Sequence, residues 1–191
     1  MSEHGPGGDG DRTRIRLVTS GRLDRTETAA VRTLLRAAFA ADAADLSELD
    51  WEHALGGVHF LLQRDRELLA HAAIVERILE VGEASLRTGY VEAVATAPHR
   101  QGQGLGSHLM RAVSDHIRER FELGALSTGR HHFYARLGWR IWPGPTGFRT
   151  AAGVRRTADD DGGVMVLLTR STPRLDPAAT IICPWRHGDV W

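Results

Sequence analysis

Gln101-Gly102-Gln103-Gly104-Leu105-Gly106 is the most informative segment of this sequence. It lies between an apolar, β-branched run at 90–96 and a segment of helical period that begins at Leu105. A strand, a glycine-rich turn and a helix start form an anion site, because the first amides of a helix lack internal partners and the helix dipole adds positive charge. Glycine lets these amides approach a phosphate closely. The segment predicts a phosphate site, with the alternative that its glycines only relieve crowding where a helix crosses a strand.

Two other phosphate-binding motifs fit the turn poorly. The dinucleotide fingerprint G-x-G-x-x-G requires a different glycine spacing and an acidic residue at the end of the next strand. The glycines here stand at 102, 104 and 106, and no acidic residue is placed in that way. The lysine of a P-loop is also missing, which argues against nucleotide hydrolysis.

The composition is typical of one globular domain. The chain has 191 residues, of which 42% are hydrophobic and 25% charged. Lysine plus arginine balances aspartate plus glutamate at 24 each, so the net charge favours neither nucleic acid nor membrane as a partner. The sequence shows no apolar run of the roughly 20 residues that span a bilayer and no apolar signal core. Cys183 is the single cysteine, which excludes an internal disulfide. We therefore expect a cytoplasmic protein.

Residues 1–12 contain glycine, proline and charged residues but almost no apolar ones, which predicts a disordered tail, and 13–191 is expected to form one domain. Expected strands lie at 14–18, 58–63, 68–79, 86–97, 123–127, 139–142 and 164–168, the last of them being the last central strand. Expected helices begin at Asp24, which is a candidate N-cap, at 105 and at 130. Consecutive antiparallel strands followed by a strand–helix–strand crossover predict an α/β fold with a mixed, mostly antiparallel sheet flanked by helices. The apolar residues near the C-terminus, among them Ile181 and Trp185, predict that this segment packs back onto the domain.

The turn and its surroundings resemble the GCN5-related N-acetyltransferase (GNAT) superfamily. Gln101, Gly104 and Gly106 match the Q/R-x-x-G-x-G/A loop that binds pyrophosphate in that superfamily. The resemblance implies the GNAT fold and acetyl-coenzyme A (acetyl-CoA) as cosubstrate, its pantetheine arm pairing with the strand before the loop. The implied cofactor-binding residues are Val94, Ala95, Thr96, Gln101, Gly102, Gln103, Gly104, Leu105 and Gly106.

Dispersed blocks at 50–57, 89–92, 123–127, 142–146, 159–162 and 188–191 resemble the aminoglycoside 2′-N-acetyltransferases. This resemblance implies direct acetyl transfer in a ternary complex to the 2′-amine of a polycationic amino sugar, antibiotic resistance, and a homodimer. Two alternatives stay open. The acceptor could be another amine, such as a cell-wall amino sugar, a polyamine or a protein amine. The chain could also be a non-catalytic module that binds acetyl-CoA or aminoglycoside.

Acetyl transfer to an amine requires a neutral amine, hydrogen-bond donors for the thioester carbonyl, and a proton for the departing thiolate. Glu92 interrupts an apolar strand, so it either faces solvent or lies in a cleft, and the resemblance makes it the candidate base, acting through water. Tyr134 is either a core residue or, by resemblance, the general acid beside the coenzyme sulfur. No protein nucleophile is needed, so Cys183 is expected to be structural.

An aminoglycoside carries several ammonium groups, so its site must offer carboxylates. Any one aspartate considered alone is more often a solvated loop residue. The resemblance nevertheless implies that several acids converge on the sugar rings, together with the indole and terminal carboxylate of Trp191, which could relay the proton of the amine. The implied substrate-binding residues are Asp42, Asp50, Glu92, Ala93, Ser127, Asp160, Asp189 and Trp191.

We expect no metal site. The run Asp159-Asp160-Asp161 lacks the spacing of a calcium loop, and none of the histidines shows zinc-ligand spacing. The histidines, including His59 and His71, are therefore expected to be surface or ordinary packing residues.

Overall fold

The computed structural model describes residues 13–40 and 47–191. The predicted tail at 1–12 and the candidate substrate residue Asp42 lie outside the described residues. The strands are β1 Arg14–Thr19, β2 Val58–Arg64, β3 Glu67–Val81, β4 Ala84–Thr96, β5 Leu123–Ser127, β6 Arg140–Ile141, β7 Thr146–Thr150, β8 Gly153–Arg156, β9 Val164–Leu168 and β10 Ile181–Pro184. The helices are α1 Arg25–Phe39, α2 Glu48–His53, α3 Leu105–Arg120 and α4 His131–Ala135, with short 3-10 helices at Ser20–Arg22, Pro98–Arg100 and Ala158–Asp160.

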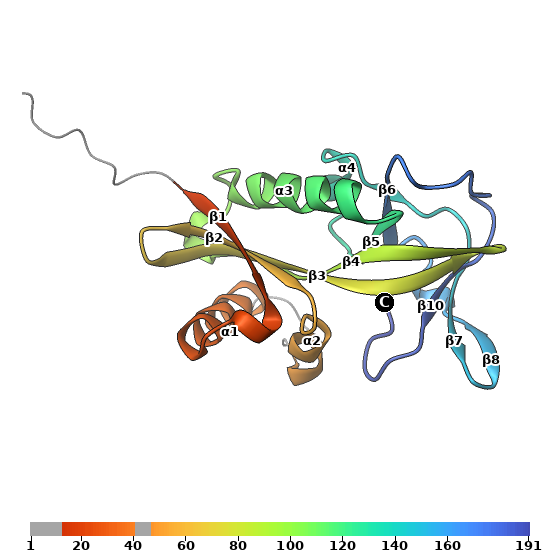
Figure 1. Cartoon of the computed structure of the whole chain (residues 1–191), viewed down its shortest axis with the longest axis horizontal. Coiled ribbons are helices and arrows are strands. Elements are labelled where there is room, and N and C mark those ends of the chain that lie inside the picture. The colour runs from red at the N-terminus through yellow and green to blue at the C-terminus, as the bar shows by residue number, and fades with distance from the viewer. Residues whose placement is uncertain (1–12, 41–46) are drawn as a thin grey trace, which may run out of the picture.

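These strands form one mixed sheet, which confirms the predicted α/β architecture (Figure 1). The order along its main path is β6-β9-β5-β4-β3-β10-β7-β8, and β2 pairs with both β1 and β3. Most neighbours are antiparallel, whereas β4 pairs with β5 in parallel, as a strand–helix–strand crossover requires.

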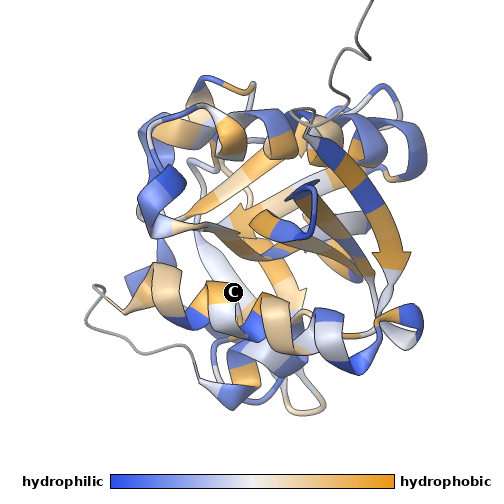
Figure 2. Cartoon of the chain, turned by 90° about the vertical axis from the view of Figure 1, so that its left-hand side faces the viewer, coloured by the Kyte–Doolittle hydropathy of each residue, from blue (hydrophilic) through white to orange (hydrophobic). Residues whose placement is uncertain are grey.

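Helices cover both faces of the sheet. Figure 1 shows α3 and α4 on one face and α1 and α2 on the other. The face of α3 that carries Leu109, Val113 and Ile117 is buried against the sheet, and Val31 and Leu35 bury α1 on the opposite side. Figure 2 shows that hydrophobic residues are concentrated on the strands between these helices. Burial of these helix faces supplies most of the stability of such a layered domain.

The start of α1 follows the sequence prediction. The Asp24 side chain accepts from the backbone N–H of Glu27, and the Glu27 side chain accepts in return from the backbone N–H of Asp24. This capping box satisfies backbone donors that have no partner within the helix.

The C-terminal third of the chain departs from the prediction. Strand β10 lies inside the sheet, antiparallel to β3 and parallel to β7, so the prediction that 164–168 is the last central strand is wrong. The prediction that this segment packs back onto the domain is confirmed, because Ile181 and Cys183 are buried there. The strands β7, β8 and β10 are short and carry glycine, arginine or proline, so their periodicity is weak. β7 and β8 pair with each other as a hairpin, whereas β10 is formed by pairing with the distant strands β3 and β7.

Two irregularities of β4 shape the site. Its register with β3 shifts between His71 and Ala73, and the pairs skip Ala93 and Val94, so β4 bulges at this point. Its parallel pairing with β5 covers only Thr88 to Tyr90, so the two strands are not paired beyond that point. A sheet that opens in this way exposes backbone groups to a ligand.

Candidate active site

Two adjoining hollows lie beside the second half of β4. The first, called the acidic pocket here, has a volume of about 820 Å³ and is lined by Glu92 and Ala93 of β4. The second, called the loop pocket, has a volume of about 460 Å³ and is lined by Val94, Ala95 and Thr96. The bulge in β4 therefore stands where the two pockets meet.

The glycine turn forms one wall of the loop pocket. Gly102 and Gly104 have φ values of 78° and 80°, which residues with a side chain rarely adopt. Gly104 is the N-cap of α3 and makes no side-chain cap, so the first amides of the helix stay available for an anion. A Cβ on Gly106 would lie 3.1 Å from Thr96 Oγ1, so this glycine also relieves crowding against β4. The crowding interpretation thus applies to Gly106, and the phosphate interpretation of the turn stays a prediction.

Eight of the nine candidate cofactor-binding residues line the loop pocket, and Gln103 does not. The Gln101 side chain donates to the Thr96 carbonyl oxygen over 3.3 Å, which ties the turn to the end of β4. Three arginines, Arg100, Arg130 and Arg136, add positive charge to the lining. Backbone amides and guanidinium groups together suit a pyrophosphate.

Tyr134 is a buried residue of α4 that lines the loop pocket. Its ring packs edge-on against Phe133 with centroids 4.9 Å apart. Burial raises the pKa of Tyr134 to about 12. The hydroxyl therefore keeps its proton at neutral pH and is available as a donor toward the pocket.

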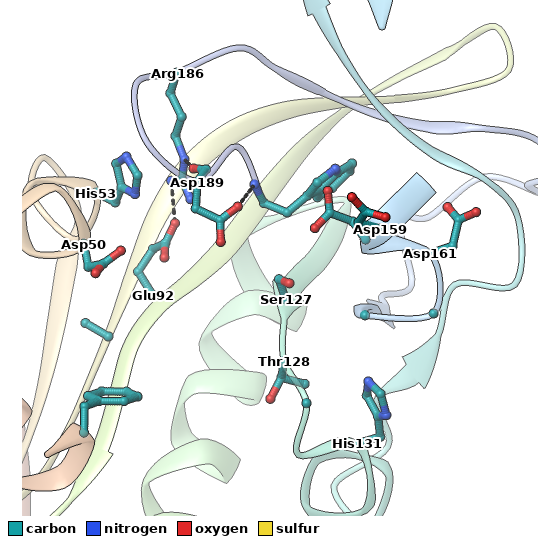
Figure 3. Close-up of a pocket in the computed structure, with 17 residues that line it drawn as sticks. Asp50, His53, Glu92, Ser127, Thr128, His131, Asp159, Asp161, Arg186 and Asp189 are labelled. Atoms are coloured by element: carbon teal, nitrogen blue, oxygen red, sulfur yellow. Dashed lines mark hydrogen bonds and ion pairs between the residues drawn. The ribbon is translucent and has the colours of Figure 1, made fainter. Parts of the chain in front are cut away.

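The acidic pocket collects residues from segments far apart in sequence (Figure 3). Asp50 comes from α2, Ser127 from the end of β5, and Asp189 from the C-terminal segment. The structure thus brings together all the candidate substrate residues that it describes, namely Asp50, Glu92, Ala93, Ser127, Asp160, Asp189 and Trp191.

The neighbouring aspartates 160 and 161 have different environments. Burial raises the pKa of Asp160, and the nearby Asp189 carboxylate adds to this shift. Asp161 instead accepts from Arg156 Nη1 at 2.8 Å and from the backbone N–H of Thr146 at 2.9 Å, and the Arg156 guanidinium holds its pKa far below the usual range. Asp161 thus has a structural role, whereas Asp160 faces a cluster of negative charge that a cation would relieve.

The Glu92 carboxylate is paired with Arg186. Arg186 Nη1 lies 2.6 Å from Glu92 Oε1, and its Nε donates to the Asp189 carbonyl oxygen at 2.7 Å. Of the two positions that the sequence left open for Glu92, the structure has the cleft, since its side chain is only 14% exposed and lines the acidic pocket. The arginine joins the C-terminal segment to the middle of β4.

Trp191 is buried and its orientation is held at two points. Its indole Nε1–H donates to Thr157 Oγ1 at 3.1 Å, and its backbone N–H donates to Asp189 Oδ1 at 3.2 Å. The indole thus forms a fixed apolar wall beside the acids of the pocket.

Known proteins resemble this chain in sequence. A family model described as "Acetyltransferase (GNAT) domain" matches residues 21–142. An aminoglycoside 2′-N-acetyltransferase of Mycolicibacterium fortuitum is 44% identical over 181 residues, which cover 92% of this chain and 91% of the relative. The chain belongs to the GNAT acetyltransferase family. The predicted relationship to the aminoglycoside 2′-N-acetyltransferases is confirmed, and so is the prediction of an acyltransferase enzyme.

Solved GNAT structures share the fold. A GNAT acetyltransferase of Brucella melitensis in complex with acetyl-CoA has a TM-score of 0.61 at 18% identity, covering 90% of this chain and 95% of the other. YhbS of Escherichia coli in complex with CoA has a TM-score of 0.64 at 16% identity, covering 95% of this chain and 93% of the other.

Sequence reasoning missed several residues that line the acidic pocket of this GNAT enzyme. Arg186 is the most important of them, and His53, Thr128, His131 and Asp159 also contribute. His53 and Asp159 fall within the blocks that carried the family resemblance, which was a usable signal. No periodic or spacing signal marks Arg186. Within 13–40 and 47–191, no helix is long and apolar enough to cross a membrane, and no cluster of metal-ligating side chains was found.

Proposed function

We propose that this GNAT enzyme transfers the acetyl group of acetyl-CoA to the 2′-amine of an aminoglycoside within a ternary complex. The observation that carries the proposal is the junction of a loop pocket suited to pyrophosphate with a pocket rich in carboxylates, at the bulge of β4. The curated relative at 44% identity supports the choice of acceptor.

In this proposal the amides of the turn and the arginines of the loop pocket hold the diphosphate. Asp50, Asp160 and Asp189 bind the ammonium groups of the sugar, because each cation relieves repulsion among these carboxylates. The indole of Trp191 packs against the sugar, and its terminal carboxylate is a further candidate for relaying a proton.

The chemistry requires one C–N bond to form and one C–S bond to break. Glu92 accepts a proton from the substrate ammonium through water, which leaves the neutral amine that attacks the thioester carbonyl. A backbone N–H of the β4 bulge donates to the carbonyl oxygen as negative charge develops on it. Tyr134 donates to the departing thiolate, which its protonated state at neutral pH allows. Because the amine attacks directly, no covalent acyl-enzyme forms.

The test compares two aminoglycosides that differ at the 2′ position, one with an amine and one with a hydroxyl. Each is incubated with the enzyme and acetyl-CoA, and the free thiol and the product mass are followed. We expect turnover and a mass gain of one acetyl group with the amine alone. Equal turnover with both would place the acetyl group on a different amine, and no turnover with either would refute an aminoglycoside acceptor. The homodimer, the cytoplasmic location and the resistance phenotype stay predictions.

A further inference from the structure

A series of hydrogen bonds, buried at its centre and partly buried at its two ends, leads to the β4 bulge from outside the two pockets. Ser20 Oγ lies 2.8 Å from His59 Nε2, His59 Nδ1 lies 2.9 Å from His71 Nε2, and His71 Nδ1 lies 2.7 Å from the Ala93 carbonyl oxygen. Both histidines have 0% exposure, so neither is a surface residue, and besides packing in the interior each makes the hydrogen bonds given above.

The donor and the acceptor of each hydrogen bond in this series follow from the last acceptor, the Ala93 carbonyl oxygen. The Ala93 carbonyl oxygen can only accept, so His71 carries its proton on Nδ1 and accepts at Nε2. His59 must then donate from Nδ1 and accept at Nε2. The Ser20 hydroxyl therefore donates to His59 Nε2 at 2.8 Å in preference to the Gly57 carbonyl oxygen, which lies farther away at 3.3 Å. Burial lowers the pKa of His59 to about 4 and that of His71 to about 3, so both rings are neutral at physiological pH, as this assignment requires.

The accepting carbonyl belongs to the strained residue of the bulge. Ala93 has a φ of 52°, in the left-handed region that a side chain disfavours. The Ala93–Val94 peptide bond is trans, so its C=O and N–H point in opposite directions. His71 therefore holds the carbonyl on one side while the Val94 N–H points away from it, and Val94 lines the loop pocket next to Ala93 of the acidic pocket.

We propose that His71 is a positioning residue for acetyl transfer, held in one tautomer by His59 and Ser20, and that it fixes the Ala93–Val94 peptide plane at the junction of the two pockets. This inference rests on the proposed acetyl transfer but not on the identity of the acceptor. Without the Nδ1–H donor, the strained bulge loses the bond that helps to hold it. The orientation of the Val94 N–H is then no longer fixed. A hydrogen-bond donor stabilises the negative charge that develops in the transition state only when it is preorganised.

The first experiment compares His71→Leu with His71→Asn in steady-state acetyl transfer. Asparagine keeps an N–H donor close to the position of Nδ1, whereas leucine keeps only the bulk. We expect kcat to fall about 10- to 100-fold in His71→Leu with little change in the KM for acetyl-CoA, and to recover largely in His71→Asn. Equal kcat in the wild type and His71→Leu would overturn the proposal.

His116→Leu serves as a matched control. This histidine lies on α3, packs edge-on against Phe60 with ring centroids 5.4 Å apart, and lines neither pocket. If His116→Leu lowers both the melting temperature and kcat as much as His71→Leu does, the effect is one of general stability, and the positioning role is refuted.

A second measurement uses the wild-type protein and needs no variant to fold. Nitrogen-15 NMR of the histidine rings distinguishes the two neutral tautomers, and we expect the Nδ1–H form for both His59 and His71 at pH 7. An Nε2–H tautomer at His71 would overturn the proposal even if the kinetics agreed. The tautomers do not depend on the acceptor, so a protein that shows them but fails to acetylate an aminoglycoside would refute the proposed function alone.

Discussion

Arg186 Nη1 lies 2.6 Å from Glu92 Oε1, so the candidate base of this enzyme is bound to a cation of the C-terminal segment. Both side chains are largely buried, at 18% and 14% exposure. An ion pair in such a place is costly to break from one side, because the remaining charge loses its partner while staying out of water. The pair thus couples the position of Glu92 to the order of the segment that carries Asp189.

Removing the cation by Arg186→Gln should lower both stability and turnover. We expect a loss of about 3 kcal/mol in the free energy of unfolding, because Glu92 is left without a partner. Arg186→Lys keeps the charge but not the second hydrogen bond to the Asp189 carbonyl oxygen, so its stability and its turnover should lie between those of the wild type and of Arg186→Gln. Urea unfolding and thiol-release kinetics measure these effects. If Arg186→Gln is as stable as the wild type, the Arg186–Glu92 pair contributes nothing to the free energy of unfolding.

Glu92→Gln keeps the shape of the side chain and removes the base. We expect kcat to fall about 100-fold or more, which is typical when a general base is lost. The Kd for acetyl-CoA should not change, because Glu92 lines the acidic pocket and not the loop pocket. Calorimetry with CoA and steady-state kinetics test the two parts separately, and an unaltered kcat would exclude Glu92 as the base.

Tyr134→Phe tests the proton donor. We expect kcat to fall about 100-fold while coenzyme binding is retained. Because burial raises the pKa of Tyr134 to about 12, the wild-type rate should show no loss from deprotonation of this tyrosine up to about pH 10. A pH–rate profile with an alkaline limb below pH 10 that disappears in Tyr134→Phe would contradict this.

Asp160→Asn and Asp189→Asn should weaken binding of the polycationic acceptor. We expect each to raise the KM for the aminoglycoside several-fold, more at low than at high salt, since the lost interaction is electrostatic. Asp161→Asn is the matched control. Its carboxylate is bound to Arg156 and Thr146, so this change should lower stability more than it raises KM. An equal rise in KM for all three variants would contradict the distinction between two substrate-binding aspartates and a structural Asp161.

The two buried histidines predict a loss of stability in mild acid. Between the unfolded pKa of about 6.5 and the folded values of about 4 for His59 and about 3 for His71, only the unfolded chain takes up these protons. The free energy of unfolding must therefore fall as the pH is lowered through this window. Urea titrations at pH 7, 6 and 5 measure the slope, and His59→Gln should reduce it. If His59→Gln leaves the slope of the free energy of unfolding against pH unchanged, His59 does not contribute to the loss of stability in acid.

Much of the fold follows from neighbours along the chain. The strand at 123–127, the cap at Asp24 and the glycine turn before α3 were all predicted from residues within a few positions of each other. Side-chain period, capping and positive φ are local properties, so a single sequence carries them in readable form. The resemblance to the family predicted that several acidic residues lie together in one pocket, which the spacing of these residues in the sequence did not predict.

Three features of the site depend on contacts between distant residues. Strand β10 lies between β3 and β7 and pairs with both of them. The Arg186–Glu92 ion pair joins residues that are 94 positions apart in the sequence. The hydrogen bond from His71 to the Ala93 carbonyl oxygen forms where the register of β3 against β4 shifts. The hydrophobic pattern and the turns set the register of regular strands, but they do not show which distant strands pair or where a bulge shifts the register. The local sequence thus specifies the phosphate turn, whereas the packed sheet arranges the groups around the junction of the two pockets.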